Sequence, residues 1–242
     1  MFLQSLREWS VAVAVVSEPY SVPDHPRWVG DLSGSVAIPW GGIAKNLPFS
    51  LLFRGQGWVA VEWGSLAVVG CYISPNCSLA EYEAYLDDLG RCVTSCAPRP
   101  VLMLGDFNAR SRVWGDTVDE PKGETILEWA AGLNLGLLNQ GSVPTCSRWQ
   151  GESIVDLSWA NPPAARLVTE WKVEECAATL SDHLYITMVV TPHSLQATPR
   201  RSSGPPRRWA LKRLDRDQLI TAAIVADWQV SEDPPDPESE AA

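Results

Sequence analysis

The feature that most constrains the fold is an apolar run at 101–104, VLML, that ends in the sequence GDFN at 105–108. The run predicts a buried β-strand, and open α/β sheets place their chemistry at the carboxyl ends of such strands. Asp106 and Asn108 are two residues apart, so on an extended backbone both side chains point to one face while Phe107 points to the other. A carboxylate and an amide are therefore expected to share one site. An ordinary turn uses the same residue types, so these residues alone do not distinguish a functional site from a turn.

Several more runs of apolar or β-branched residues, separated by turn residues, predict strands. They are Val11–Ser17, Ser35–Pro39, Trp58–Trp63, Leu66–Ile73, Pro100–Leu104, Ile154–Trp159, Leu167–Val173 and His183–Val190. The run Trp58–Trp63 does not alternate cleanly, which predicts burial on both faces of a sheet. Gly64 and Ser65, between two of the runs, predict a tight hairpin turn.

Two segments have apolar residues at helical spacing. The first runs from Ser78 to Cys96, and Glu81 three residues after Ser78 completes a capping-box pattern. The second runs from Gly123 to Ala131, with Gly132 expected to stop it. Many strands with a few interspersed helices predict an α/β fold, a four-layer sandwich of two packed mixed β-sheets flanked by helices.

The folded domain is expected to span residues 1–191, because linker composition begins at Thr191 and continues through 192–242. That tail is predicted to be largely disordered, with a short helix from Trp209 to Ala226. It contains a basic block, made of Arg200, Arg201, Arg207, Arg208, Lys212 and Arg213. It ends in an acidic stretch at 227–242 that has no Lys or Arg.

Composition narrows the function classes. A chain of 242 residues with 45% hydrophobic residues has room for a sizeable core. The net charge of −10 argues against a nucleic-acid partner, but more than half of that charge lies in the acidic end of the tail. The six cysteines have neither zinc-knuckle nor disulfide spacing, so reduced, buried thiols are expected. The apolar run from Val11 is too short for a membrane span, so the chain is read as soluble, with no membrane partner.

More polar residues stand at the ends of predicted strands. They are Glu18, Tyr72, Ser153, Asp156 and the sequence Ser181-Asp182-His183. Each alone is usually a cap or a turn. Together they supply what metal-assisted phosphodiester hydrolysis requires: oxygen ligands for Mg²⁺ in Glu18 and Asp182, a water-orienting pair in Asp106 and Asn108, and an imidazole oriented by a carboxylate in His183 and Asp156.

The ordered series Glu, Tyr-x-Ser-Pro, Gly-Asp-Phe-Asn, Ser-x-x-Asp and Ser-Asp-His, from Glu18 to His183, resembles the exonuclease-endonuclease-phosphatase superfamily. Within it, the sequences at 17–20, 71–75, 105–110, 144–145 and 181–183 are most similar to the endonuclease domain of non-LTR (LINE-type) retrotransposon polyproteins. The segment at 207–215 resembles the link from that domain to a downstream reverse transcriptase.

The resemblance implies a role for each matching residue. Glu18 and Asp182 would serve the metal, which is Mg²⁺ with Mn²⁺ as the alternative. Five residues would be catalytic, namely Tyr72, Asp106, Asn108, Asp156 and His183. Five others would support the site or contact DNA, namely Ser74, Thr145, Arg148, Ser153 and Ser181. The implied reaction nicks one strand of double-stranded DNA in the nucleus and leaves a 3′ hydroxyl that primes reverse transcription. A hairpin around Ser142–Gly151 is expected over the DNA groove, where Arg148 and Trp149 either touch DNA or pack.

One departure from the family and three alternatives stay open. The family begins with a strand that carries a metal-side Asn, and here the chain begins at what looks like the following helix, Phe2–Ser10. The first strand is therefore expected to be missing. The alternatives are a catalytically impaired remnant that keeps the scaffold, an abasic-site repair nuclease, and a lipid or inositol phosphatase of the same fold.

Overall fold

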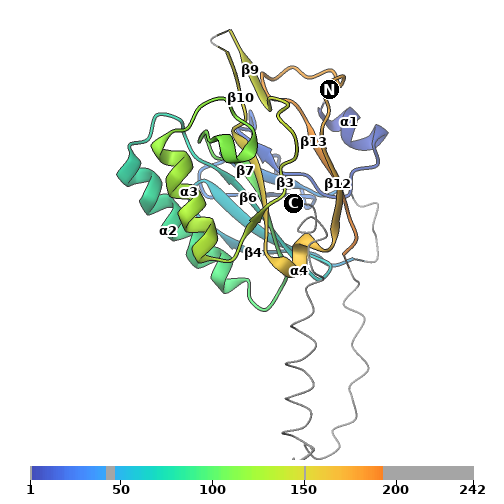
Figure 1. Ribbon diagram of the computed structural model, residues 1–242. Coiled ribbons are helices and arrows are strands. Elements are labelled where there is room, and N and C mark those ends of the chain that lie inside the picture. Colours follow the sequence, from blue (N-terminus) through green and yellow to red (C-terminus); the bar gives the residue numbers. More distant parts are fainter. Residues whose placement is uncertain (1, 42–46, 150, 193–242) are drawn as a thin grey trace, which may run out of the picture. The chain divides into compact units, whose positions relative to one another are not determined.

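The computed structural model describes residues 2–41, 47–149 and 151–192 (Figure 1). The chain divides into two units, Met1–Gln196 and Ala197–Ala242. The second unit lies outside the described residues, as do the predicted tail helix and the basic block. The predicted domain boundary at 191/192 and the disorder of the tail therefore stay predictions.

A six-stranded mixed sheet forms the centre of the first unit. Its strand order is β4-β5-β6-β7-β11-β8. In chain order these strands are β4 Phe49–Arg54, β5 Trp58–Trp63, β6 Leu66–Tyr72, β7 Val101–Asp106, β8 Gly136–Leu137 and β11 Asp156–Ala160. Only β6 and β7 pair in parallel; the other neighbours are antiparallel. The parallel pair requires a crossover connection, and helix α2 provides it.

The central strands are buried on both faces, as predicted for Trp58–Trp63. Trp58 and Ala60 of β5 pack into one hydrophobic core, and Val59 and Val61 pack into another on the opposite face. Side chains alternate in the same way along β6 and β7. The two faces of the sheet therefore support two cores, and the rigid strands between them end at the site described below.

Helices cover the first of these cores. Helix α2 spans Leu79–Ser95 and has the predicted capping box, in which Ser78 and Glu81 exchange hydrogen bonds. Helix α3 spans Pro121–Gly132, so Gly132 is its last residue instead of its stop. The two helices lie side by side on the same face of the sheet (Figure 1). Shorter helical segments are the 3₁₀ helix η1 Arg112–Trp114 and helix α4 Pro162–Ala165.

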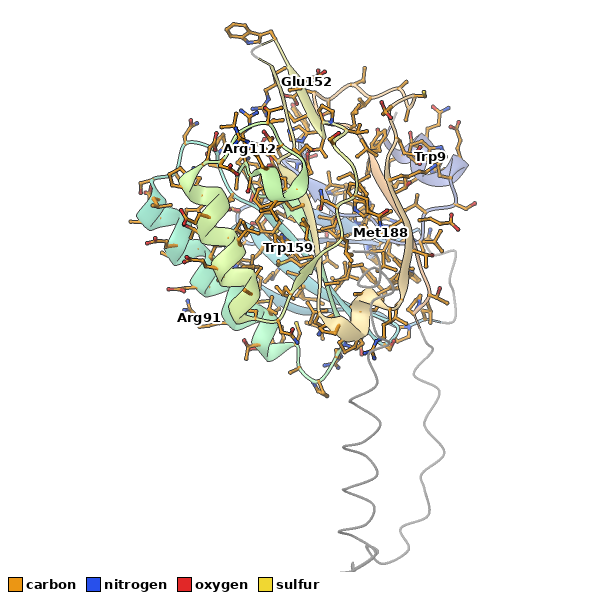
Figure 2. The ribbon with its side chains drawn as sticks, in the orientation of Figure 1. Trp9, Arg91, Arg112, Glu152, Trp159 and Met188 are labelled. Atoms are coloured by element: carbon orange, nitrogen blue, oxygen red, sulfur yellow. The ribbon has the colours of Figure 1, made fainter. Side chains whose placement is uncertain are left out.

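A second strand layer packs against the other core. It consists of two small antiparallel sheets: β1-β3-β2, made of Val16–Ser17, Val36–Pro39 and Trp28–Gly30, and the pair β12 Val168–Val173 with β13 Ile186–Val190. Val36 and Ile38 of β3 share this core with Met188 and Val190 of β13. Figure 2 labels one residue of each core: Met188 belongs to this core and Trp159 to the core beneath α2 and α3. Helix α1, Phe2–Glu8, places Phe2 against Trp28. The predicted α/β class with helix-flanked sheets is thus confirmed.

Several strand boundaries differ from the prediction. Within the apolar run Val11–Ser17, only β1 forms a ladder with β3. The earlier residues contact the end of β3 and the residues after it through the isolated Val13–Trp40 bridge and single backbone hydrogen bonds. Strand β13 begins three residues later than predicted, and His183 forms an isolated bridge. Edge strand β4 was missed because it is half exposed and lacks a clean pattern. The predicted hairpin is present but shifted, with β9 at Cys146–Arg148 and β10 at Gly151–Ser153. None of the described helices is both long and apolar enough to cross a membrane.

Candidate active site

Three of the predicted catalytic side chains stand in a row across neighbouring strands. Tyr72 is the last residue of β6 and pairs in register with Asp106, the last residue of β7. Asp106 pairs in turn with Asp156, the first residue of the antiparallel strand β11. The carboxyl ends of two parallel strands and the start of an antiparallel one meet at one edge of the sheet. The hydrogen-bond register of the sheet therefore brings the three residues together.

His183 joins this row from the loop that precedes β13. Its backbone forms a bridge with Cys146, and the neighbouring bond from the Leu184 N–H to the Thr145 carbonyl, 2.8 Å, supports that bridge. Nδ1 of His183 lies 2.8 Å from Oδ2 of Asp156. Nε2 then faces Asp106, whose Oδ2 is 4.0 Å away. The predicted His–carboxylate pair is present, and it leaves one ring nitrogen directed into the site.

Asp106 and Asn108 also converge as expected, although the backbone between them is not simply extended. Asn108 has a φ of 44°, in the left-handed region that Asn tolerates better than most residues. Its backbone N–H and its Nδ2 donate to the two oxygens of Asp106 at 3.0 and 2.9 Å. Nδ2 also donates to the Ile73 carbonyl at 3.0 Å. Phe107 is fully buried on the other side. The sequence offered an ordinary turn and a shared site as alternatives. The structure has a turn that brings both side chains into one site.

The pKa values of Asp106 and His183 are both shifted from their ordinary values. Burial, and then repulsion from Asp156, raise the pKa of Asp106 to about 7 against the attraction of His183 and the hydrogen bonds from Asn108. Burial alone would lower the pKa of His183, but the hydrogen bond to Asp156 and the surrounding carboxylates outweigh it and raise that pKa. The site therefore contains more negative charge than its own histidine neutralises.

Tyr72 and Glu18 form the opposite end of the row. Glu18 follows β1 with a φ of 48°, and its backbone N–H donates to the Ser35 carbonyl at 2.8 Å. Burial, and then a hydrogen bond with Glu18, raise the pKa of the Tyr72 hydroxyl, so that it stays protonated. Tyr72 is therefore a hydrogen-bond donor beside an exposed carboxylate.

Asp182 and Arg148 form an ion pair beside His183. Nε of Arg148 donates to Oδ2 of Asp182, and its Nη2 lies 3.4 Å from Nε2 of His183. Oδ1 of Asp182 is 4.0 Å from the same ring nitrogen. The Ser181 hydroxyl accepts the N–H of His183 at 3.1 Å. Arg148, predicted to touch DNA or pack, thus contacts the site itself, whereas Trp149 at the hairpin tip is 93% exposed and does not pack.

The remaining predicted residues differ in how they contribute. Thr145 is fully buried, and its hydroxyl accepts the N–H groups of Val155 and Asp156, each at 3.1 Å. Ser153 accepts a backbone bond from Thr145 at 3.0 Å within the hairpin. Ser74 is exposed and accepts the N–H of Asn76 at 3.3 Å. Thr145 therefore fixes the start of β11, and Ser74 shapes a turn.

Two features escaped the sequence reading. Asp116, which is almost fully buried, pairs with Arg110 and accepts the N–H of Ile154 at 2.7 Å, so it ties the loop after Asn108 to the strand before Asp156. Cys146 lies beside His183. Cys146 could have been predicted from its position next to Thr145, whereas no motif or spacing in the sequence singles out Asp116.

The described residues contain two groups whose ligand atoms lie within 4.8 Å of one another and suit a metal ion. One consists of Asp106, Asp156 and His183, and the other of Cys146, Asp182 and His183. Glu18 belongs to neither group, so its role as a ligand stays a prediction. A cleft of about 500 Å³ adjoins the site; Asn108, Arg110, Lys122 and Arg148 contribute to its lining.

Comparison with known proteins identifies related sequences and folds. Residues 66–187 match the family model described as endonuclease-reverse transcriptase. Among solved structures, the endonuclease domain of TRAS1, a telomere-specific non-LTR retrotransposon, has 23% identity and a TM-score of 0.67, covering 78% of this chain and 90% of that one. An AP endonuclease from Archaeoglobus fulgidus has 13% identity and a TM-score of 0.62, covering 78% and 93%. The 3′ phosphatase NExo from Neisseria has 14% identity and a TM-score of 0.53, covering 78% and 82%. At these identities the three structures show a shared fold. Curated proteins gave no match.

Proposed function

Since the chain belongs to the endonuclease-reverse transcriptase family, we propose that it is a metal-dependent DNA endonuclease that nicks one strand of duplex DNA. The observation that carries the proposal is the geometry of four side chains. Tyr72, Asp106 and Asp156 stand in register across the sheet, and His183 is held 2.8 Å from Asp156 with its other nitrogen toward Asp106. Phosphodiester hydrolysis needs a water-activating base and donors to the phosphate in one place, and this row provides both.

Asp106 and Asn108 are the pair that prepares the water. Both hydrogen-bond donations from the Asn108 Nδ2 are directed to protein oxygens, so Oδ1 is its remaining group for a water molecule. Asp106, with a pKa of about 7, is poised to accept the proton as the water oxygen attacks phosphorus. The new bond joins that oxygen to phosphorus. The bond from phosphorus to the 3′ oxygen breaks, and this oxygen takes a proton from solvent, which leaves a 3′ hydroxyl and a 5′ phosphate.

His183 and Tyr72 are the donors to the phosphate. Asp156 holds Nδ1 of His183, so Nε2 carries a proton when the ring is charged, and the raised pKa favours that state. Tyr72 keeps its hydroxyl proton because burial, and then the hydrogen bond with Glu18, raise its pKa. Two donors on either side of Asp106 stabilise the charge that develops on the phosphoryl oxygens.

The residues present fit a divalent cation. Carboxylate oxygens of Asp106 and Asp156 lie within 4.8 Å of each other, and a cation nearby would offset the repulsion that, after burial, raises the pKa of Asp106. Hard oxygen ligands favour Mg²⁺, with Mn²⁺ as the alternative. We assign Glu18 and Asp182 as the residues that would hold the ion, which leaves Asp106 free to act as the base. When bound, the ion would supply Lewis-acid polarisation of the phosphate and neutralise its charge.

The biological setting belongs to the same proposal. The 3′ hydroxyl would prime reverse transcription by a downstream domain of the same polyprotein, and the nuclear chromosome would be the substrate. The family description, which joins an endonuclease with a reverse transcriptase, supports this setting, as does the fold shared with the TRAS1 endonuclease domain.

The test is nicking of supercoiled plasmid DNA in Mg²⁺, followed with and without EDTA. We expect conversion to the relaxed form, and losses of about a hundredfold or more in Asp106→Ala and His183→Ala. Asp24→Ala and His25→Ala are matched controls, since both residues are exposed in the loop before β2. Full activity of either site variant would refute the assigned roles.

Two other substrates distinguish the alternatives. Cleavage only of a duplex with a single abasic position would identify a repair nuclease, which the fold shared with the Archaeoglobus enzyme makes a necessary comparison. Stable binding of duplex DNA without cleavage, even in millimolar Mg²⁺ or Mn²⁺, would identify a remnant that keeps only the scaffold. Release of inorganic phosphate from an inositol phosphate would identify a phosphatase.

A further inference from the structure

A second ligand set shares His183 and Asp182 with the site above but differs from it in chemistry. Cys146, Asp182 and His183 offer sulfur, oxygen and nitrogen, with the three ligand atoms within 4.8 Å of one another. Cys146 is buried, His183 is half-buried and Asp182 is exposed, so solvent reaches the set at Asp182. The proposed phosphodiester chemistry has no use for this thiol. The thiol needs another explanation.

The backbone holds the three residues in place. Cys146 and His183 lie opposite each other in an antiparallel bridge. Hydrogen bonds of 2.8 Å flank the bridge on both sides, from Ser147 N–H to the Asp182 carbonyl and from Leu184 N–H to the Thr145 carbonyl. The backbone positions of the ligands are therefore set by hydrogen bonds, and little backbone has to be ordered on binding.

The histidine has the surroundings of a metal ligand. Nδ1 faces Asp156 at 2.8 Å, so Nε2 is the nitrogen directed toward Asp182, at 4.0 Å. A carboxylate behind a ligating imidazole fixes the ring orientation and raises its basicity, an arrangement common at zinc sites. Arg148 occupies Oδ2 of Asp182 and leaves Oδ1 facing the ring. Nε2 of His183 lies 3.4 Å from Nη2 of Arg148, and Oδ1 of Asp182 accepts the Ser181 hydroxyl at 3.4 Å, so a metal ion would replace two long contacts.

We propose that Cys146, Asp182 and His183 form a binding site for Zn²⁺, which inhibits the enzyme by taking His183 from the phosphate. Thiolate and imidazole ligands favour Zn²⁺ over Mg²⁺, and three protein ligands leave the fourth tetrahedral position to water. On binding, the Cys146 thiol releases its proton to solvent as the zinc–sulfur bond forms. The inhibition rests on the proposed nuclease function, whereas the binding does not.

The charge around the thiol favours a dication. Burial, together with the carboxylates of Asp182, Asp156 and Asp106, raises the pKa of Cys146 to about 11 against the opposing effect of Arg148. A lone thiolate is thus disfavoured. The same carboxylates attract Zn²⁺, and a coordinating thiol is deprotonated by the metal itself. The thiol therefore stays protonated and inert until the metal arrives.

The first experiment measures binding without reference to activity. Zn²⁺ affinity is measured by competition with a chromophoric chelator, and Co²⁺ serves as a spectroscopic probe whose thiolate charge-transfer band requires a cysteine ligand. We expect Cys146→Ser to bind Zn²⁺ about tenfold or more weakly and to lose the cobalt band. Cys176→Ser, which removes an exposed free cysteine, is the matched control and should behave as the unmodified protein.

The second experiment adds Zn²⁺ to plasmid nicking in excess Mg²⁺. Inhibition should be about tenfold weaker in Cys146→Ser than in the unmodified protein or Cys176→Ser. Equal zinc affinity or equal inhibition in Cys146→Ser and the unmodified protein would overturn the inference. Zinc binding that depends on Cys146 in a protein that never nicks would refute the proposed function and leave the site standing. If Cys146→Ser does not fold, Cys146→Ala takes its place in both measurements.

Discussion

Thr145→Val should destabilise the domain more than its nearly unchanged shape suggests. The Thr145 hydroxyl accepts the N–H groups of Val155 and Asp156, each at 3.1 Å, and Thr145 is fully buried. Valine has the same shape but no acceptor, so both N–H groups lose their partner. A buried group left unsatisfied costs about 1–3 kcal/mol. The pair therefore predicts a loss of about 2–6 kcal/mol, and at about 2–4 °C per kcal/mol for a domain of this size the melting temperature should fall by about 4–24 °C.

Thr145→Ser is the matched control, because it keeps the hydroxyl and removes one methyl group. Its expected cost is about 1 kcal/mol. Urea unfolding, followed by tryptophan fluorescence, gives both free energies of unfolding and also shows whether the m-value is unchanged. A Ser variant that is less stable than the Val variant would show that the methyl group matters more than the acceptor, and the reasoning would fail.

The same substitution tests how the site is held together. Thr145 fixes the start of β11, and Asp156 at that start holds His183. A displaced Asp156 should therefore lower plasmid nicking in Thr145→Val at temperatures where the variant is still folded. Thr145→Ser should keep most of the activity.

Two further predictions concern regions outside the catalytic row. Asp31 accepts backbone N–H groups of Val36 and Gly57 at 3.0 and 2.8 Å; burial would raise its pKa, but its hydrogen bonds outweigh burial and leave the pKa below the ordinary 3.8. Its stabilising contribution is therefore complete above that ordinary pKa and is lost as the pH falls through the lower folded-state value. In urea unfolding, Asp31→Asn should be less stable than the unmodified protein at pH 7, and the difference in free energy of unfolding should narrow below pH 3.8. A difference that is constant with pH would contradict this. Trp149 is 93% exposed at the tip of the β9–β10 hairpin, so Trp149→Ala should leave the melting temperature unchanged. A stacking contact with DNA worth about 1–3 kcal/mol predicts a loss of affinity of about 5- to 150-fold in fluorescence anisotropy; unchanged affinity would exclude that contact.

Local patterns predicted a good part of the fold. The capping box at Ser78 and Glu81 is confirmed because both partners lie within one turn of α2. The two-faced burial of Trp58–Trp63 is confirmed because a central strand must be apolar on consecutive positions. Strand boundaries were less predictable. The run His183–Val190 predicts one strand, but His183 is directed into the site, Tyr185 packs against Phe2 and Trp9, and only Ile186–Val190 pairs with β12.

For the site, the sequence by itself determined which side chains were available, since the order of motifs from Glu18 to His183 singled out the residues that converge. Only the tertiary structure decided their contacts. The register that aligns Tyr72, Asp106 and Asp156, and the bridge that sets Cys146 opposite His183, join segments far apart in the chain. A strand pattern states which residues share a face, but it does not state which residue of another strand lies opposite. The hydrogen-bond ladders and the packed cores beneath them set this pairing. They bring the carboxylate, imidazole and thiol close to one another.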